Sequence, residues 1–272
     1  QFFGHARIIA DMSTKVFCLI LNYNRPKDTV KCANSLLSSK LPPATEIVVI
    51  DNGKENLNKY FVKNIPNIIY IKSPGNIGFA AGNNQGIKYA LAHGATHILV
   101  INPDVTVPHN FLLPLLSTFR VRPRRVGLVA PAHTEGKGSY GLGGKVDWKW
   151  CAFPHDNVTK LPTKPRKYDL LTFACVLIKR EVFETVGLMD ERYFLYLEDV
   201  DYCVSAARAS YSLYIDPGVV IKHMTSSSFG DPRGKIKFSF NSSVIFIRKW
   251  YRFPANILPL IHTLYFYPSL YV

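Results

Sequence analysis

Short apolar runs alternate with segments of helical periodicity along the first half of the chain. The runs are rich in Val and Ile and are too short to be helices. They cover residues 16–21, 46–50, 67–71, 97–101 and 126–130. Such runs are typical of parallel strands that are buried on both faces, and the segments 27–39 and 80–92 between them predict helices. This alternation predicts a doubly wound α/β sheet.

In such a sheet, ligands bind outside the carboxyl ends of the strands, so the residues that follow each run are candidate site residues. These stretches read NYNRP, DNGKEN, SPGNIGFAAGNN and NPDV. Each also has a purely local explanation, because Asn, Asp, Gly and Pro form turns and glycines let a helix pack closely on a sheet. The glycine-rich stretch has neither the GxGxxG spacing of dinucleotide sites nor the Gly-Lys-Ser/Thr of a P-loop.

Three side chains near strand ends could bind a ligand directly. Asp51 follows the second run and either forms an Asx turn or accepts a hydrogen bond from a ligand such as a nucleobase. Asp104 follows the fourth run and either belongs to a turn or shares a hard cation with phosphate oxygens. His223 is either a structural histidine or a further ligand of the same cation.

The stretch LEDVDYC places three carboxylates within four residues. Val200, Val204 and Ala207 have helical spacing and are expected to face the core, so Glu198 and Asp199 lie at the start of a helix. These two either cap the helix and complement its dipole, or provide a general base in a partly dry site. Clustered carboxylates in apolar surroundings raise one another's pKa, which suits the second role.

The chain is strongly basic, with 33 Lys and Arg residues against 19 acids and a formal net charge of +14. This excess indicates an anionic partner, such as a nucleotide diphosphate, a membrane surface or a nucleic acid. With 47% hydrophobic and 19% charged residues, the chain is expected to fold rather than to be disordered. Its five cysteines show no CxxC spacing, which argues against disulfides or a zinc site and for a reducing compartment.

Two regions depart from the α/β pattern. Residues 132–168 are rich in Gly, Pro, Lys and aromatic residues and predict a mobile or irregular insertion over a site. From about residue 226, basic and aromatic residues interleave, which suits a membrane interface, an ordinary solvated helix or single-stranded nucleic acid. The last twenty residues are mostly apolar but contain three prolines, so they are expected to lie at an interface or dock on protein rather than span a bilayer.

Taken together and in this order, the stretches resemble those of the family 2 glycosyltransferases, especially the rhamnosyltransferase-like branch. The resemblance rests on LILNYNR, IVVIDNG, NIGFAAGNNQGI, ILVINPDV, REVFETVGLMDERYFLYLEDVDYC and the downstream His223, over about residues 15–225. It implies a GT-A fold, which is Rossmann-like with a mostly parallel central sheet flanked by helices. It also implies transfer of a sugar from a nucleotide diphosphate to a hydroxyl group, with inversion at the anomeric carbon.

The resemblance implies roles for individual residues. Asp199 matches the catalytic base, with Glu198 beside it, and Asp104 and His223 match ligands of Mg²⁺ or Mn²⁺. The positions that match the nucleotide-sugar site are Asn22, Tyr23, Asn24, Asp51, Asn76, Gly78, Phe79, Asn83, Asn102 and Asp104.

Asp201 and Phe173 match positions near the acceptor. The chain departs from the family pattern at three places. Asn102 stands where a fuller metal motif has Asp, DNGKEN lacks the Ser and Asp that usually follow DNG, and Phe173 stands where relatives usually have Gly. Phe173 motivates an alternative interpretation, a catalytically silent nucleotide- or glycan-binding protein on the same fold.

The expected donor is dTDP-rhamnose or a UDP-sugar, and the expected acceptor is a cell-surface glycan or a lipid-linked oligosaccharide. Nucleic acid is not an expected partner, because the ordered motifs favour a nucleotide sugar. The expected organisation is an N-terminal extension (1–12), a catalytic domain (13–225) with nucleotide-sugar (13–107) and acceptor (108–225) halves, and a membrane-associating segment (226–272). This organisation predicts a cytoplasmic enzyme bound peripherally to the inner face of the plasma membrane.

Overall fold

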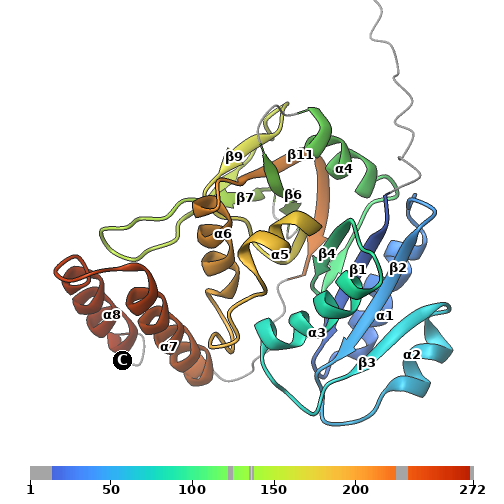
Figure 1. Cartoon of the computed structure of the whole chain (residues 1–272), viewed down its shortest axis with the longest axis horizontal. Coiled ribbons are helices and arrows are strands. Elements are labelled where there is room, and N and C mark those ends of the chain that lie inside the picture. Colours follow the sequence, from blue (N-terminus) through green and yellow to red (C-terminus); the bar gives the residue numbers. More distant parts are fainter. Residues whose placement is uncertain (1–13, 122–124, 135, 137, 225–231, 270–272) are drawn as a thin grey trace, which may run out of the picture.

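Of the 272 residues of the chain, the computed structural model describes 14–121, 125–134, 136, 138–224 and 232–269. In this part of the chain, one mixed sheet has the strand order β3-β2-β1-β4-β10-β6-β11-β5 (Figure 1). Three further strands, β7, β8 and β9, attach to it. The N-terminal extension expected at 1–12 lies outside the described residues.

The first four strands in this order are parallel, as the apolar runs predict. They are β1 (Val16–Asn22), β2 (Thr45–Asp51), β3 (Ile68–Lys72) and β4 (His97–Ile101). The register pairs Asn22 with Asp51, so β1 and β2 end at the same level. The polar residues that follow these strands therefore meet at one edge of the sheet.

An antiparallel strand joins this half of the sheet to the rest. β10 (Cys175–Lys179) lies between β4 and β6 (Val126–Thr134) and is antiparallel to both. β11 (Ser212–His223) runs parallel to β6, and the short β5 (Val105–Thr106) pairs with the end of β11. The predicted α/β class is confirmed, with a sheet that becomes mixed beyond β4.

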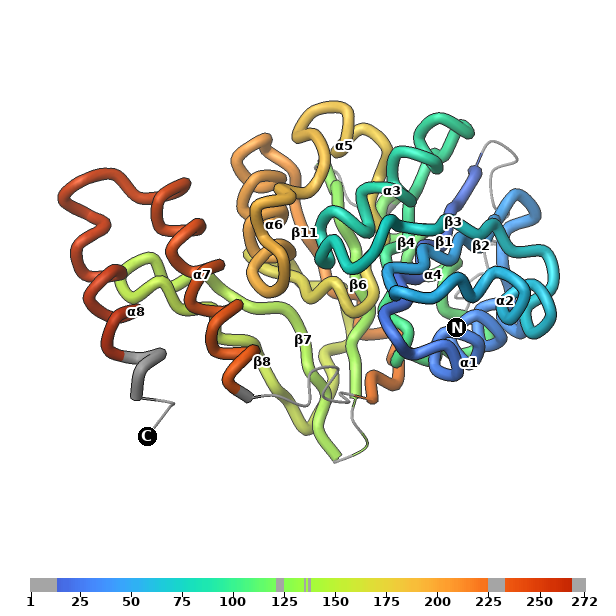
Figure 2. The backbone as a smooth tube through the Cα atoms, turned by 90° about the horizontal axis from the view of Figure 1, so that it is seen from below, coloured from blue at the N-terminus to red at the C-terminus, as the bar shows by residue number. Residues whose placement is uncertain are grey.

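Helices cover both faces of the sheet and bury two apolar cores (Figure 2). The first core packs against α3 (Phe79–Ala92), α5 (Arg180–Val186) and α6 (Glu198–Arg208). The second packs against α1 (Pro26–Leu37), α2 (Asn58–Asn64) and α4 (Leu112–Val121). In β1, Phe17 and Leu19 face the first core and Cys18 and Ile20 face the second, which is why this strand reads as a continuous apolar run. All five cysteines are free and buried.

The prediction of an irregular insertion at 132–168 is wrong for part of this segment, which carries three short strands. They are β7 (Tyr140–Gly144), β8 (His155–Val158) and β9 (Arg166–Tyr168). The glycines allow close packing: a Cβ at Gly141 would lie 2.2 Å from the His133 ring, and one at Gly143 would lie 2.4 Å from Tyr168. The glycine content that suggested irregularity therefore reflects tight contacts between strands and rings.

Two C-terminal helices, α7 (Pro232–Trp250) and α8 (Ile257–Ser269), pack side by side at one end of the molecule (Figures 1 and 2). Asp201 on α6 anchors α7, because its buried carboxylate accepts hydrogen bonds from Lys249 Nζ at 2.7 Å and Trp250 Nε1 at 2.8 Å. A buried carboxylate requires such partners. Among the helices that the structure describes, none combines the length and the apolar character needed to cross a bilayer.

The loop 188–197, which leads into α6, docks on the N-terminal half of α3. The backbone N–H of Phe79 donates a hydrogen bond to the carbonyl of Phe194 at 2.8 Å. The buried amide of Asn84 donates to the carbonyl of Met189 at 2.9 Å and accepts from its N–H at 3.1 Å. These contacts connect α3, in the N-terminal half of the chain, to the loop that precedes the carboxylate cluster.

Backbone conformation explains why this docking is needed. Tyr196 and Leu197 both have left-handed backbones, with φ of 68° and 64°, which side-chain-bearing residues adopt only when their surroundings hold them. Gly78 makes room for the loop, since it has a φ of 90° and a Cβ there would lie 2.7 Å from the carbonyl oxygen of Phe194.

Replacing Gly78 by Ala is expected to destabilise the protein through both backbone strain and this clash. Gly187 is a matched control, because its backbone angles are nearly the same but nothing lies within 4 Å of the position that an added Cβ would take. Gly187→Ala should lower the free energy of unfolding by about 1–3 kcal/mol through strain alone. Gly78→Ala should lower it by a further 1–3 kcal/mol or so. Urea unfolding measures both values, and equal losses would show that the contact with Phe194 contributes nothing.

Candidate active site

The end of β2 places Asp51 in a buried network. Its carboxylate accepts hydrogen bonds from Asn22 Nδ2 at 2.9 Å, the Tyr70 hydroxyl at 2.7 Å and the Gly53 N–H at 3.2 Å, and Lys72 Nζ lies 3.5 Å away. Burial by itself raises the pKa of Asp51, but the hydrogen bonds from Tyr70, Asn22 and the backbone outweigh it and lower the pKa. The expected Asx turn to Gly53 is present. Contact with a nucleobase stays a prediction.

The glycine-rich stretch forms a second polar network near this strand end. Asn52 Nδ2 donates to Asn76 Oδ1 at 3.2 Å and to the carbonyl of Gly78 at 3.1 Å. Asn83 is fully buried, and its Nδ2 donates to the carbonyl of Phe79 at 3.0 Å. Its Oδ1 has no hydrogen-bond partner among the described residues. A buried amide oxygen without a partner is unfavourable, so a donor from a ligand would stabilise it.

The structure brings Asp104 and His223 together. β11 pairs with β5 so that His223 stands opposite Val105, and His223 Nε2 lies 3.4 Å from Asp104 Oδ1. The expected turn is also present, because the N–H of Val105 donates to the carbonyl of Asn102 at 3.2 Å. The turn therefore positions the carboxylate of Asp104. Its sharing of a cation with phosphate oxygens stays a prediction.

A carboxylate oxygen and an imidazole nitrogen this close can hold one divalent cation between them. Within the described part of the chain, no group of three His, Cys, Asp or Glu side chains could hold a metal by itself. Two protein ligands would leave the remaining positions to phosphate oxygens and water, which Mg²⁺ usually keeps in proteins. The donor set fits a cation that is shared with a diphosphate.

Sequence reasoning missed two basic side chains beside this pair. Arg25 Nη1 lies 3.5 Å from Asp104 Oδ2, while Nη2 of the same residue pairs with Asp28 at 2.7 Å. The His133 ring lies 6.0 Å from the His223 ring. Arg25 was visible in NYNR, but its partner lies far away in the sequence. His133 carried no signal, because its strand enters the segment that was expected to be irregular.

α6 begins with Glu198 and Asp199, which lie close together in dry surroundings. The N–H of Val200 donates to Asp199 Oδ1 at 2.8 Å, whereas Glu198 is buried and its Oε2 has no partner among the described residues. Burial, followed by the charge of Asp199, raises the pKa of Glu198 well above its usual value. Burial also raises the pKa of Asp199, against the hydrogen bond from Val200 and the charge of His155. No sequence signal identified His155, which comes from β8.

One short segment lies between the Asp104 turn and these carboxylates. The N–H of Asn102 donates to the carbonyl of Ala174 at 2.9 Å, and the backbone of Phe173 hydrogen-bonds to Asp199 and lowers its pKa. The ring of Phe173 is 2% exposed and packs edge-on against Tyr202 in the core. Its backbone therefore faces the site, and its buried ring does not offer the acceptor contact that the sequence suggested.

The other predicted residues are placed differently. Asp201 is occupied by α7 and by the Tyr193 hydroxyl at 3.2 Å, so an acceptor could reach its carboxylate only by displacing a structural partner. Acceptor binding by Asp201 stays a prediction. Tyr23 is half-buried and Asn24 is exposed with a φ of 54°, both in the turn after β1.

This fold is shared with a solved glycosyltransferase structure. A crystal structure of GalNAc-T7 with UDP, GalNAc and Mn²⁺ superposes with a TM-score of 0.70 at 17% identity, over 88% of this chain and 48% of that one. This likeness shows that the two molecules share the GT-A fold. Residues 18–187 match the model of the family described as Glycosyl transferase family 2. The chain belongs to this family, as the ordered motifs predicted.

Two curated relatives match at similar levels. The low-salt glycan biosynthesis hexosyltransferase Agl10 of Haloferax volcanii is 25% identical over 206 residues, which cover 72% of this chain and 62% of that protein. The N-acetylglucosaminyl-diphospho-decaprenol L-rhamnosyltransferase of Mycobacterium tuberculosis is 26% identical over 240 residues, which cover 77% and 78%. This chain thus spans less than two thirds of the Haloferax protein. The expected likeness to rhamnosyltransferases is confirmed.

Replacing Glu198 by Gln is expected to make stability less dependent on pH. The raised pKa means that the folded protein keeps a proton that the unfolded chain releases, so wild-type stability falls as pH rises above the ordinary value of 4.5. Relative to wild type, Glu198→Gln should gain stability with rising pH, by about 1.4 kcal/mol for each unit by which the pKa is raised. Urea unfolding between pH 4 and 8 or so measures this difference, with the exposed Glu55→Gln as a control. If the difference in unfolding free energy between wild type and Glu198→Gln does not change with pH, the pKa of Glu198 is not raised in the folded protein.

Proposed function

We propose that this protein is an inverting, metal-assisted glycosyltransferase that moves a sugar from a nucleotide-diphosphate donor to a hydroxyl of a cell-surface glycan or lipid-linked oligosaccharide. The observation that carries the proposal is the position of the segment 173–174. The carbonyl of Ala174 accepts a hydrogen bond from Asn102 in the Asp104 turn, and the backbone of Phe173 hydrogen-bonds to Asp199, the proposed general base. The segment 173–174 therefore contacts two groups: the Asp104 turn, which suits the negative charge of the donor, and Asp199, which suits the proton of the acceptor.

On the donor side, the amides at the ends of β1 and β2 are proposed to bind the nucleotide sugar. Hydrogen bonds from Asn22 and Tyr70 keep the carboxylate of Asp51 ionised, so that it can accept a hydrogen bond from an N–H of the nucleobase. Gly78 and Asn76 belong to the polar network of Asn52 beside this site, and their contact with the nucleotide sugar is part of the proposal. The unpartnered Oδ1 of Asn83 suits a sugar hydroxyl.

Asp104 and His223 would hold Mg²⁺ or Mn²⁺ against the diphosphate. When bound, such a cation stabilises the negative charge that a leaving diphosphate gains. Arg25 adds a permanent positive charge on the same side, 3.5 Å from Asp104. The cation and Arg25 would together balance the negative charge of the diphosphate. The basic composition of the chain predicted such an anionic partner.

On the acceptor side, Asp199 is proposed to accept the proton of the attacking hydroxyl. A hydroxyl is a poor nucleophile at neutral pH, so a base that removes its proton as the new bond forms lowers the barrier. The N–H of Val200 donates to Asp199 Oδ1, whereas Glu198 Oε2 has no partner among the described residues, so the negative charge of the pair is better stabilised on Asp199. Attack opposite the diphosphate inverts the anomeric centre without a covalent enzyme intermediate.

Two observations support a lipid-linked acceptor, and the first also supports rhamnose as the transferred sugar. The proposed donor is dTDP-rhamnose or a UDP-sugar. The Mycobacterium relative is named as an L-rhamnosyltransferase that acts on a decaprenyl-linked sugar. The connection between α7 and α8 exposes Phe253, and α8 exposes Ile257, Leu258, Ile261, Leu264 and Tyr265. The segment 232–272 contains six Lys and Arg residues and no acids. Such a surface suits peripheral binding to anionic lipids, and we place the enzyme on the cytoplasmic leaflet of the plasma membrane.

Nucleotide binding measured by calorimetry tests the donor site. The panel is dTDP, UDP, GDP and CDP, each with and without Mn²⁺. One nucleotide should bind in a metal-dependent manner, and Asp104→Ala should weaken it at least tenfold, or about 1.4 kcal/mol. Asp28→Ala is a matched control, because Asp28 pairs with the same Arg25 on its other side. If no nucleotide binds to the folded protein, or if both variants bind equally, the proposed donor site is wrong.

A further inference from the structure

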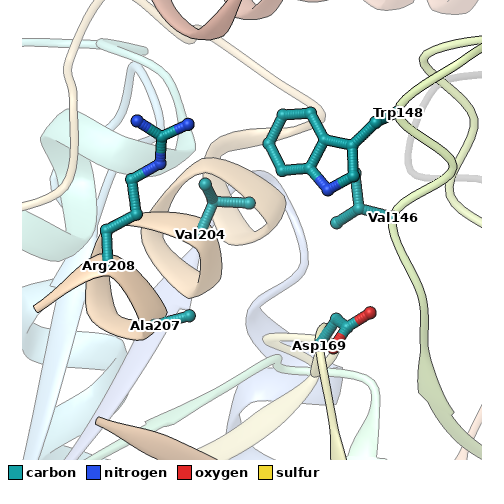
Figure 3. Close-up of a pocket in the computed structure, with 6 residues that line it drawn as sticks. All are labelled: Val146, Trp148, Asp169, Val204, Ala207 and Arg208. Atoms are coloured by element: carbon teal, nitrogen blue, oxygen red, sulfur yellow. The ribbon is translucent and has the colours of Figure 1, made fainter. Parts of the chain in front are cut away.

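A pocket of 270 Å³ opens beside α6, away from the residues already assigned. Its six lining residues are Val146, Trp148, Asp169, Val204, Ala207 and Arg208 (Figure 3). Trp148 and Arg208 approach from opposite sides, with Val204 between them. Ala207, whose spacing predicts a core position, is exposed here instead. The insertion that contains β7 and β8 supplies one wall, and α6 supplies the other.

The polar groups of this pocket are not used by the described part of the protein. Within these residues, no hydrogen bond or ion pair engages the carboxylate of Asp169 or the indole N–H of Trp148, and both side chains are exposed. Arg208 lies against the face of the Trp250 ring, 4.6 Å away, and its N–H groups have no carboxylate partner among the described residues. The pocket therefore combines a small apolar floor with unused donors and an unused acceptor.

The two planar side chains are held in place before any ligand arrives. Trp148 stacks on Phe246 with ring centroids 6.1 Å apart and also contacts Tyr251 at 5.6 Å. Arg208 lies over Trp250, whose indole N–H is bound to the buried Asp201. Docking of α7 on α6 thus fixes both planes, and fixed groups bind a ligand with less loss of side-chain freedom.

We propose that this pocket binds one saccharide unit of the acceptor glycan. A pyranose ring has an apolar face of C–H groups, which suits the Trp148 ring, and a rim of hydroxyls, which suits Asp169 and Arg208. Opposite charges on the rim favour a neutral polar ring over a simple anion or cation. The apolar floor, formed by two valines and an alanine, favours a ring over a strongly hydrated ligand.

The position of the pocket suits an acceptor rather than a donor. Val204 and Arg208 follow Asp199 on the same helix by five and nine residues, which is roughly 8 and 14 Å along its axis. The insertion borders both places, because His155 is close enough for its charge to lower the pKa of Asp199, and Trp148 lines the pocket. A short oligosaccharide could therefore occupy the pocket with one unit while presenting a hydroxyl to the base. This inference rests on the proposed transfer to a glycan.

Saturation-transfer NMR on the full chain tests the inference, with the methyl glycosides of rhamnose, galactose, glucose and N-acetylglucosamine as probes. At least one glycoside should receive saturation, and Trp148→Ala should reduce its signal at least fivefold. Trp150→Ala is the matched control, since this neighbouring tryptophan is equally exposed but does not line the pocket. With this variant, the glycoside signal should stay within twofold of that with wild type. Asp169→Asn, an isosteric change at an exposed residue, should reduce the glycoside signal threefold or more. This variant provides the test if Trp148→Ala does not fold.

Two further samples distinguish a saccharide pocket from the donor site and from a pocket for an apolar chain. Excess UDP with Mn²⁺ should leave the glycoside signal unchanged, and a signal that UDP abolishes would place the sugar at the donor site and overturn the inference. Hexanol should not compete, and competition would instead indicate a pocket for an apolar chain. Equal signals from Trp148→Ala and Trp150→Ala would also overturn it. If calorimetry detects no nucleotide while the glycoside result holds, the donor proposal fails and the saccharide pocket stands.

Discussion

The docking of the loop 188–197 onto α3 is the contact on which the rest of the site depends. The loop enters α6 through two left-handed residues, Tyr196 and Leu197, and it is held by hydrogen bonds to Phe79 and Asn84. Together with the hydrogen bond from the Tyr193 hydroxyl to Asp201, these contacts fix where α6 begins. Because the first turn of α6 carries Glu198 and Asp199, the glycine-rich stretch after β3 positions the proposed base as well as the donor.

Charge is divided within this frame in a way that explains the acidic cluster of a basic chain. Arg25 and the Asp104–His223 pair lie on the side proposed for the diphosphate. The carboxylate pair lies across the segment 173–174, in surroundings dry enough to raise both pKa values. Asp201, the third acid of the cluster, has a different task, because it holds Lys249 and Trp250 and so joins α7 to α6.

Strands β1 to β4 and helices α1 and α3 could be predicted from sequence, because apolar runs and helical periodicity mark them, whereas α2 was not predicted. The pairing of Asp104 with His223 was suggested only by family resemblance, since their contact depends on how β5 pairs with β11. The strands of 132–168 could not be predicted, because their glycines serve close packing against His133 and Tyr168. Arg25 and His155 were missed because their partners are distant in sequence.

The measurement that tests the account most directly is release of nucleoside diphosphate from dTDP-rhamnose and UDP-sugars, by wild type and by Asp199→Asn, with Mn²⁺ and a panel of glycoside acceptors. The account predicts that wild type releases nucleotide from one donor. Asp199→Asn should bind that nucleotide equally well but release it at least about a hundredfold more slowly, which is the loss expected for a general base. Equal rates for the two proteins would contradict the role of Asp199, and binding without any release by wild type would mark a silent member of the family.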